Sequence, residues 1–115
     1  MKLGKFKWTG ASGKVYRMEA FSLDTVVKPG ISGNYVFGEL NEDGTKIRAI
    51  YIGEGNLQDR INFRIREGRV QEKGCNCFCA MINEDEDSRK EIEDDLLASN
   101  PNSNEPIGCN IKPGG

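Results

Sequence analysis

The segment AIYIGEGNLQDRI, residues 49–61, combines residue types that suit the binding of a phosphate group. Tyr51 ends an apolar run, Gly53 and Gly55 follow it, and Arg60 lies in the helical pattern after the glycines. Glycine permits sharp turns, so the chain can reverse here and bring Tyr51 and Arg60 to one surface. A guanidinium binds a phosphate or a carboxylate through two parallel hydrogen bonds. Both kinds of partner are open for Arg60.

Glu93 is the second residue whose position suggests chemistry. It belongs to an acidic run, residues 83–95, most of which a solvated helix face explains. On a helical wheel Glu93 falls between Leu96 and Leu97, so it faces the body of the protein. Three other acids of the run point elsewhere: Glu91, Asp94 and Asp95. A carboxylate in that position needs a cation or a raised pKa. Arg89, one turn earlier, and a metal ion are equally good candidates for the cation.

The elements that must position these side chains can be predicted from periodicity and turn residues. Residues 5–21 form a β-hairpin around the turn TGASG, and residues 34–40 and 47–53 form a second hairpin around NEDGT. A helix follows from about Leu57 to Arg66. The stretch CNCFCAMI, residues 75–82, is a further strand, and a second helix runs from about Asp85 to Ser99. The tail after Pro101 is expected to be loop.

The cysteines are expected to be small packing residues. Cys75, Cys77 and Cys79 lie two residues apart, which in a strand places them on one face and disfavours disulfides between them. Ligands spaced in this way along a flat strand do not converge as zinc ligands do. We therefore expect free cysteines, reduced and without metal.

The tyrosines of the second hairpin, Tyr35 and Tyr51, would each be structural if taken alone, but a larger pattern includes them. GNYVF (33–37), YIG (51–53), Arg60, Glu93 within EIEDDLL, and PNSN (101–104) follow one another in this order. In order and approximate spacing this pattern resembles the GIY-YIG nuclease family. The resemblance covers residues 31–104. It is closest to small stand-alone members with an SGK-type hairpin before the core, which takes in residues 5–21.

The resemblance implies a fold and an activity. The expected fold is α+β: one domain, residues 1–115, with a small antiparallel β-sheet flanked by α-helices and an extra N-terminal β-hairpin. The implied reaction is the hydrolysis of a DNA phosphodiester bond with Mg²⁺ or Mn²⁺ as cofactor. The alternative is a degenerate GIY-YIG domain that binds nucleic acid or protein without cleavage.

The resemblance also implies roles for individual residues. Tyr35 and Tyr51 position or deprotonate the attacking water, Arg60 binds the scissile phosphate, and Glu93 holds the metal ion. Asn104 matches the family's late asparagine. Either tyrosine can be the base, and with no histidine in the chain a tyrosine base needs help from a metal ion or an arginine.

Charge and composition indicate partners. The net charge is −2, yet the stretch around Arg64, Arg66 and Arg69 is basic and is expected to contact DNA phosphates; a solvated helix face is the other explanation. No apolar run is long enough to span a membrane, and nothing at the N-terminus resembles a secretory signal. We therefore expect a cytoplasmic protein that has no membrane contact.

Overall fold

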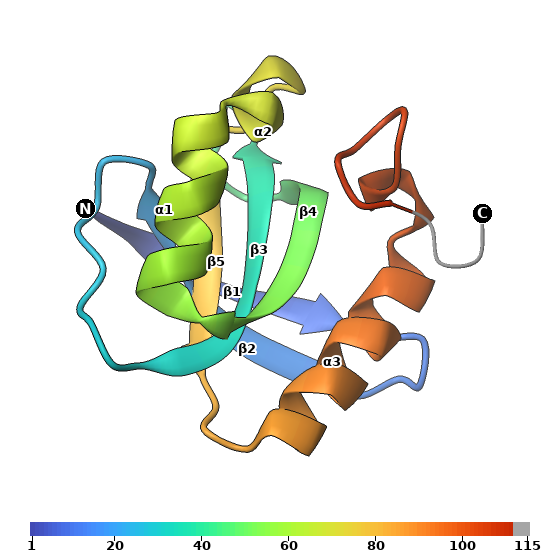
Figure 1. Ribbon diagram of the computed structural model, residues 1–115. Helices are drawn as coiled ribbons and strands as arrows, with labels where there is room; N and C mark the ends of the chain where they lie inside the picture. The colour runs from blue at the N-terminus through green and yellow to red at the C-terminus, as the bar shows by residue number, and fades with distance from the viewer. Residues whose placement is uncertain (112–115) are drawn as a thin grey trace.

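The computed structural model describes residues 1–111 of the chain. Strands and helices cover most of this length and build one α+β unit (Figure 1). The elements in chain order are β1 (Lys2–Thr9), β2 (Val15–Ser22), β3 (Ser32–Leu40), β4 (Ile47–Asn56), α1 (Leu57–Glu67), α2 (Arg69–Glu72), β5 (Cys77–Ile82), α3 (Glu86–Ser99) and the 3₁₀ turn η1 (Pro101–Ser103). The predicted class, a small antiparallel sheet flanked by helices with an N-terminal hairpin, is confirmed.

The five strands form a single antiparallel sheet in the order β1-β2-β5-β3-β4. Two hairpins, β1–β2 and β3–β4, are local in sequence, and β5 lies between them. Both hairpins occur where the turn residues predict them. Because β5 pairs with β2 on one side and with β3 on the other, it joins the N-terminal hairpin to the rest of the sheet.

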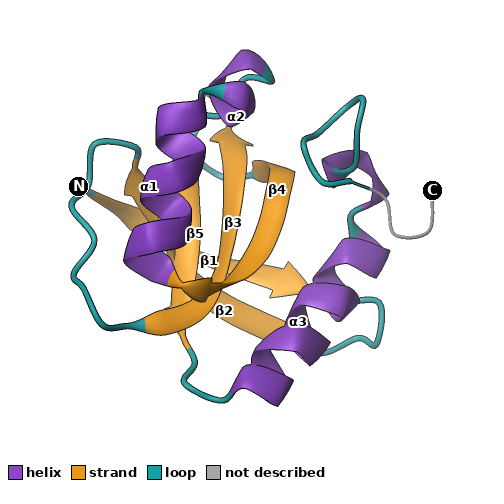
Figure 2. Cartoon of the chain, viewed as in Figure 1, coloured by secondary structure: helices purple, strands orange, loops and turns teal. Residues whose placement is uncertain are grey.

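The sheet carries helices on both faces (Figure 2). On one face α1 packs over a cluster that includes Tyr35, Phe37, Ile61 and Phe78. On the other face, residues of α3 join a second cluster of nine buried residues: Trp8, Met18, Ala20, Val36, Ala49, Ile52, Cys79, Ile92 and Leu96. Neighbouring residues of a strand point to opposite faces, so a strand covered on both sides is apolar throughout.

The two long helices begin and end where the sequence predicts. The amide of Asp59 donates to the Asn56 side chain at 3.0 Å and caps α1, which ends at Gly68 with a φ of 80°. Asp85 caps α3 by accepting from the Ser88 amide at 3.1 Å. Capping residues provide partners for amides that the helix itself leaves unpaired.

The segment after α3 differs from the predicted loop. It forms η1 and then runs along the free edge of β4, where the Cys109 amide donates to the Ile50 carbonyl at 2.8 Å. The Asn110 side chain accepts from the Ile52 amide at 2.8 Å and donates to the Ile52 carbonyl at 2.9 Å. This segment therefore protects an edge strand that would otherwise expose unpaired backbone groups.

The cysteines are buried and free within residues 1–111, but they do not share one face as predicted. Cys75 lies before β5 and packs in the cluster on the α1 side, whereas Cys79 packs on the α3 side. Burial raises the pKa of Cys75 to about 12, that of Cys77 to about 11 and that of Cys79 to about 12. These thiols are protonated at neutral pH and act as small core side chains.

Candidate functional site

Tyr35 and Tyr51 lie on neighbouring strands of the sheet, beneath α1. Their rings stack with centroids 6.2 Å apart and an interplanar angle of 26°. Tyr35 is paired in register with Gly53, the glycine of YIG, and a Cβ at Gly53 would lie 2.4 Å from the Tyr35 hydroxyl oxygen. No larger residue fits there without displacing Tyr35. The absence of a side chain at Gly53 therefore leaves the space that the Tyr35 ring occupies.

Gly55 and α1 bring Arg60 to the same region. Gly55 has a φ of 131°, which side-chain-bearing residues rarely adopt, and the chain turns there into the helix. A Cβ on Gly55 would lie 3.2 Å from Arg60 Nε, so the arginine lies across the turn. Arg60 is exposed, and it makes no salt bridge to any of residues 1–111. Its guanidinium is available for a phosphate.

Arg64 also belongs to this site, although the sequence analysis predicted it only as a DNA-binding arginine. Its Nη2 donates to the Tyr51 hydroxyl at 2.7 Å, and its guanidinium carbon lies 4.2 Å from the centre of the Tyr51 ring. Burial lowers the pKa of Arg64, but its interactions with Tyr51 and Glu67 outweigh burial and raise it. The sequence signal was the spacing, because Arg64 lies one helical turn after Arg60.

Glu93 reaches the site from α3, on the other side of the sheet edge. It is half-buried and makes no salt bridge within the described chain. Its pKa is raised to about 7, first by burial and then by the charges of Glu54 and Asp94, while Arg60 opposes the shift. The wheel prediction that Glu93 faces the protein body is therefore confirmed.

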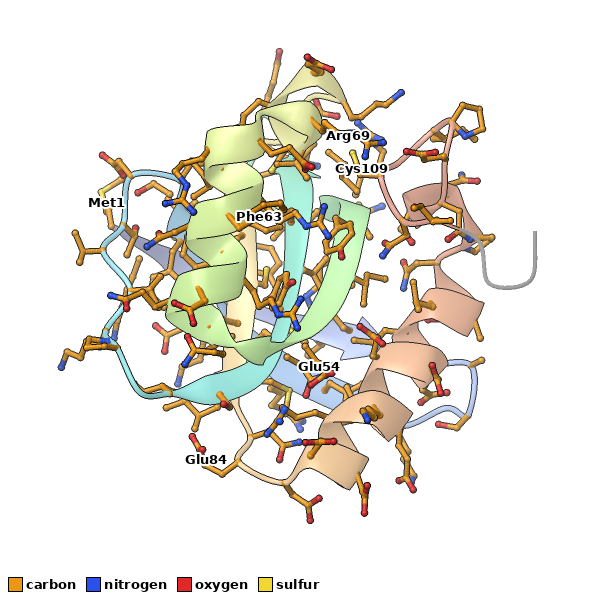
Figure 3. All side chains as sticks on the ribbon, viewed as in Figure 1. Met1, Glu54, Phe63, Arg69, Glu84 and Cys109 are labelled. Carbon is orange, nitrogen blue, oxygen red and sulfur yellow. The ribbon has the colours of Figure 1, made fainter. Side chains whose placement is uncertain are left out.

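The predicted alternative for Glu93, an ion pair with Arg89, is wrong. Arg89 is buried, and its Nε donates to Glu54 on β4 at 2.9 Å while its Nη1 donates to the Asn83 carbonyl at 3.0 Å. Figure 3 shows Glu54 between the sheet and α3. The nearer partner comes from another element, which helical spacing alone cannot reveal. Glu93 is thus left without a cation.

Asn34, the polar residue in GNYVF, is buried at the same junction. Its Nδ2 donates to the Arg89 carbonyl at 2.9 Å, which connects β3 to the first turn of α3. The backbone of Asn34 is in register with Glu54 of β4. Asn34 therefore fixes the helix that carries Glu93 and does not itself face the site.

The charges of four of the predicted residues shift the pKa of Tyr35. Tyr35 is buried, with 2% of its surface exposed, and burial is the main reason why its pKa is raised. The Tyr51 hydroxyl and Glu93 raise this pKa further, whereas Arg64 and Arg60 lower it. Tyr35 on β3 therefore lies within electrostatic range of residues from β4, α1 and α3.

Asn104 comes from the segment that follows α3. It follows η1, its backbone forms an isolated bridge with Asn110, and its Oδ1 is buried without a hydrogen-bond partner among the described residues. No hydrogen bond joins it to Tyr35, Tyr51 or Glu93 in residues 1–111. The structure thus places Asn104 in the segment that covers the edge of β4.

The three predicted DNA-binding arginines differ in their surroundings. Arg66 is exposed and makes no salt bridge with any part of the chain the structure describes. Arg64 pairs with Glu67 at 3.2 Å, and Arg69 pairs with Glu105. Two of these cations therefore already have a carboxylate partner.

Glu93 is the residue of this region with the chemistry of a divalent-cation ligand. Within residues 1–111 no three acidic, cysteine or histidine side chains are grouped to hold a metal ion. Glu93, however, makes no salt bridge within the described residues, and burial and then the charge of Glu54 raise its pKa. Mg²⁺ in proteins is commonly held by one or two carboxylates and keeps several water molecules. Glu93 is the residue that would hold such an ion.

Comparison with known proteins yields no relative: no family model, no curated protein and no solved structure matches this chain.

Proposed function

We propose that this protein is a metal-dependent endonuclease that hydrolyses DNA phosphodiester bonds. The observation that carries the proposal is the stack of Tyr51 on Tyr35 beneath α1, with Arg64 bonded to the Tyr51 hydroxyl at 2.7 Å and Arg60 exposed one helical turn earlier. Glu93 on α3 lies within electrostatic range of Tyr35 and Arg60. These are the residue types that phosphodiester hydrolysis needs: a phenol that takes up a proton from water when it is in its phenolate form, a cation for the phosphate, and a carboxylate for a metal ion. The motif resemblance to GIY-YIG nucleases supports the same assignment.

The environments of the two tyrosines favour Tyr51 as the group that accepts the proton from water. Burial raises the pKa of Tyr35, which disfavours its phenolate form. Tyr51 is more exposed, and its oxygen accepts a hydrogen bond from the charged Arg64. Tyr35 then supports the ring of Tyr51 through the stack between them.

The remaining residues bind and orient the substrate. Arg60, exposed and unpaired with any acid in residues 1–111, binds the scissile phosphate through two hydrogen bonds. Glu93 holds the divalent cation, which when bound supplies positive charge for the phosphate oxygens and lowers the pKa of its bound water. The part of the chain that the structure describes has no helix long and apolar enough to cross a membrane. A location in the cytoplasm belongs to the same proposal.

A plasmid-nicking assay with Mg²⁺ or Mn²⁺ tests the proposal. Wild-type protein converts supercoiled plasmid to nicked circles, and chelation of the metal ion abolishes the conversion. Tyr51→Phe lowers the rate by about 10²–10⁴-fold, the usual contribution of a positioned acid or base, whereas Tyr35→Phe has a much smaller effect.

The same assay decides against the alternative of a domain that binds nucleic acid or protein without cleavage. Wild-type protein that binds the plasmid and leaves it intact with either metal ion would establish that alternative. Equal rates for wild type and Tyr51→Phe would show instead that a contaminating nuclease produces the nicks.

A further inference from the structure

A groove lies on the opposite side of α1 from the tyrosines. It has a volume of about 610 Å³ and is bounded by the face of β2 and β5, the start of α1, and the connection between β2 and β3, residues 23–31. Figure 1 shows this connection passing beside α1 on its way from β2 to β3. Pockets of about 300–1,000 Å³ are typical of sites that enclose a small molecule or an anchoring side chain.

The floor of the groove is apolar and extends to an exposed apolar rim. Phe21 and Phe78 stack on the floor with ring centroids 5.4 Å apart, and Leu57 and Ile61 close one side. At the rim Val26 is 89% exposed and Ile82 is 68% exposed. Apolar side chains in such a hollow and around its mouth favour an occupant that carries a large apolar group.

The charged residues of the groove are mostly cations without acidic partners. Lys5 and Arg17 line it from β1 and β2, and Lys28 lines it from the connection to β3. None of these three forms a salt bridge with residues 1–111, and the one acid in the lining, Glu19, pairs with Lys2 at 3.4 Å. The chain as a whole carries a net charge of −2. The groove is therefore positive on an acidic protein, and its polar occupant is an anion.

The placement of the cations selects among anionic occupants. Lys5 and Arg17 come from the sheet and Lys28 from the connection, so the three cations lie on different walls of the groove. The occupant has several negative charges around an apolar group. A short acidic peptide with one large apolar side chain meets both requirements, because aspartate and glutamate flank the anchor at intervals of one or two residues.

We propose that this groove binds an acidic peptide segment of a partner protein, anchored by a large apolar side chain that lies on Phe21 and Phe78. The segment's carboxylates pair with Lys5, Arg17 and Lys28. The groove is separate from the tyrosine site, so this interaction does not depend on the nuclease proposal.

Selection from a random peptide library displayed on phage, with the full chain as bait, tests the proposal. We expect the enriched peptides to share aspartate or glutamate on both sides of a tryptophan, phenylalanine or leucine. A synthetic copy, labelled with a fluorophore, is then titrated by anisotropy. Arg17→Glu and Val26→Asp each weaken its binding by about tenfold or more, and Lys46→Glu, in the turn between β3 and β4, changes it less than twofold.

Each of the following results would overturn the proposal. The first is no enrichment or enrichment without acidic residues; the second is unchanged binding by Arg17→Glu. The third is displacement of the peptide by a DNA duplex together with loss of duplex binding in Arg17→Glu, which would make the groove a nucleic-acid surface. Both substituted side chains are exposed, so their variants should fold. Amide shifts of the wild-type protein on peptide binding provide the check, since shifts confined to regions away from Phe21 and Phe78 would also refute the site.

Discussion

Glu93 differs from its acidic neighbours because the fold leaves it half-buried and unpaired. The charge of Glu54 acts on its carboxylate, and Glu54 itself accepts a hydrogen bond from Arg89 at 2.9 Å. Burial and the charges of nearby acids disfavour the ionised form of this carboxylate in the free protein. In the nuclease that we propose, a divalent cation bound to Glu93 offsets that cost.

The first prediction is that Glu93→Gln loses most DNA cleavage and keeps DNA binding, because the amide has the same shape and cannot supply an anionic ligand. Glu91→Gln and Asp94→Asn, which alter exposed residues of the same helix, should cleave nearly as well as wild type. Plasmid nicking and gel-shift titrations measure the two properties. Cleavage by Glu93→Gln at the wild-type rate would refute the metal-binding role.

The second prediction concerns pH. The folded state raises the pKa of Glu93 from 4.5 to about 7, so it holds this proton more tightly than the unfolded chain does. The contribution of Glu93 to stability therefore decreases as pH rises from about 4.5 to about 7 and is constant above that. Glu93→Gln removes this contribution, and the variant gains stability relative to wild type over the same interval.

Urea unfolding of both proteins between pH 4 and pH 8 measures this gain, with Glu91→Gln as the matched control. In wild type, Mg²⁺ should bind more tightly as pH rises through about 7, because the ligand must lose its proton first. A difference between wild type and Glu93→Gln that does not vary with pH would show that the carboxyl titrates normally.

At the scale of elements, long-range contacts determine where the helices and edges lie. Asp95 of α3 accepts hydrogen bonds from the Ser12 amide at 2.8 Å and from the Tyr16 hydroxyl at 2.6 Å. The approach is close enough that a Cβ at Gly10 would collide with the Asp95 carboxylate. The turn TGASG is therefore a docking point for the helix that carries Glu93, as well as a reversal between two strands.

The third prediction is that Asp95→Asn weakens the docking of the β1–β2 turn on α3. Amide hydrogen exchange of Ser12 should become faster, because an uncharged side chain is a weaker acceptor for that amide. Asp94→Asn, on the exposed side of the helix, should leave this exchange unchanged. Unchanged exchange in both variants would mean that the turn is held by its own backbone bonds.

The fourth prediction concerns the segment that covers the edge of β4. Asn110→Ala removes both hydrogen bonds to the backbone of Ile52, the residue after Tyr51, and should destabilise the protein by about 1 to 3 kcal/mol. Denaturant unfolding measures the loss, and Asn102→Ala, at an exposed position of η1, is the control. Equal stability of the two variants would show that water replaces Asn110 at this edge.

At the scale of the whole molecule, the chain has a net charge of −2, yet some of its surfaces carry cations without acidic partners. Arg60 and Arg66 on α1 are exposed and have no carboxylate partner within residues 1–111. The groove with Lys5 and Arg17 lies on the other side of that helix. One helix thus separates two positive surfaces, for which we propose different partners.

The fifth prediction is that Arg66→Ala lowers the slope of DNA affinity against salt concentration by about one unit, as expected for the loss of one phosphate contact. Arg69→Ala should have a smaller effect, because Arg69 already pairs with Glu105. Lys5→Ala, in the groove, is the control and should leave the slope unchanged. Binding isotherms at several salt concentrations measure the slope. Equal slopes for all variants would show that these arginines are exposed residues of the helix that contact no phosphate.

The sequence by itself determined the long helices and both hairpins, because their signals are local, but not α2 or η1. Alternation and turn residues predicted both hairpins, Asn56 predicted the start of α1, Asn100 and Pro101 predicted the end of α3, and helical spacing predicted that Glu93 faces inward. Each signal lies within a few residues of the feature it predicts. The expected α+β class follows from them.

Tertiary structure alone decided the partners of the charged and polar groups. Arg89 pairs with Glu54, Asp95 with Ser12, and Asn110 with the backbone of Ile52, and in each pair the residues come from different elements. Such pairs depend on how the sheet is assembled. β5 joins the two hairpins, and α3 follows β5 in the chain and packs on the finished sheet. A carboxylate and a guanidinium attract over any sequence separation, so only the fold determines which of several candidates is nearest.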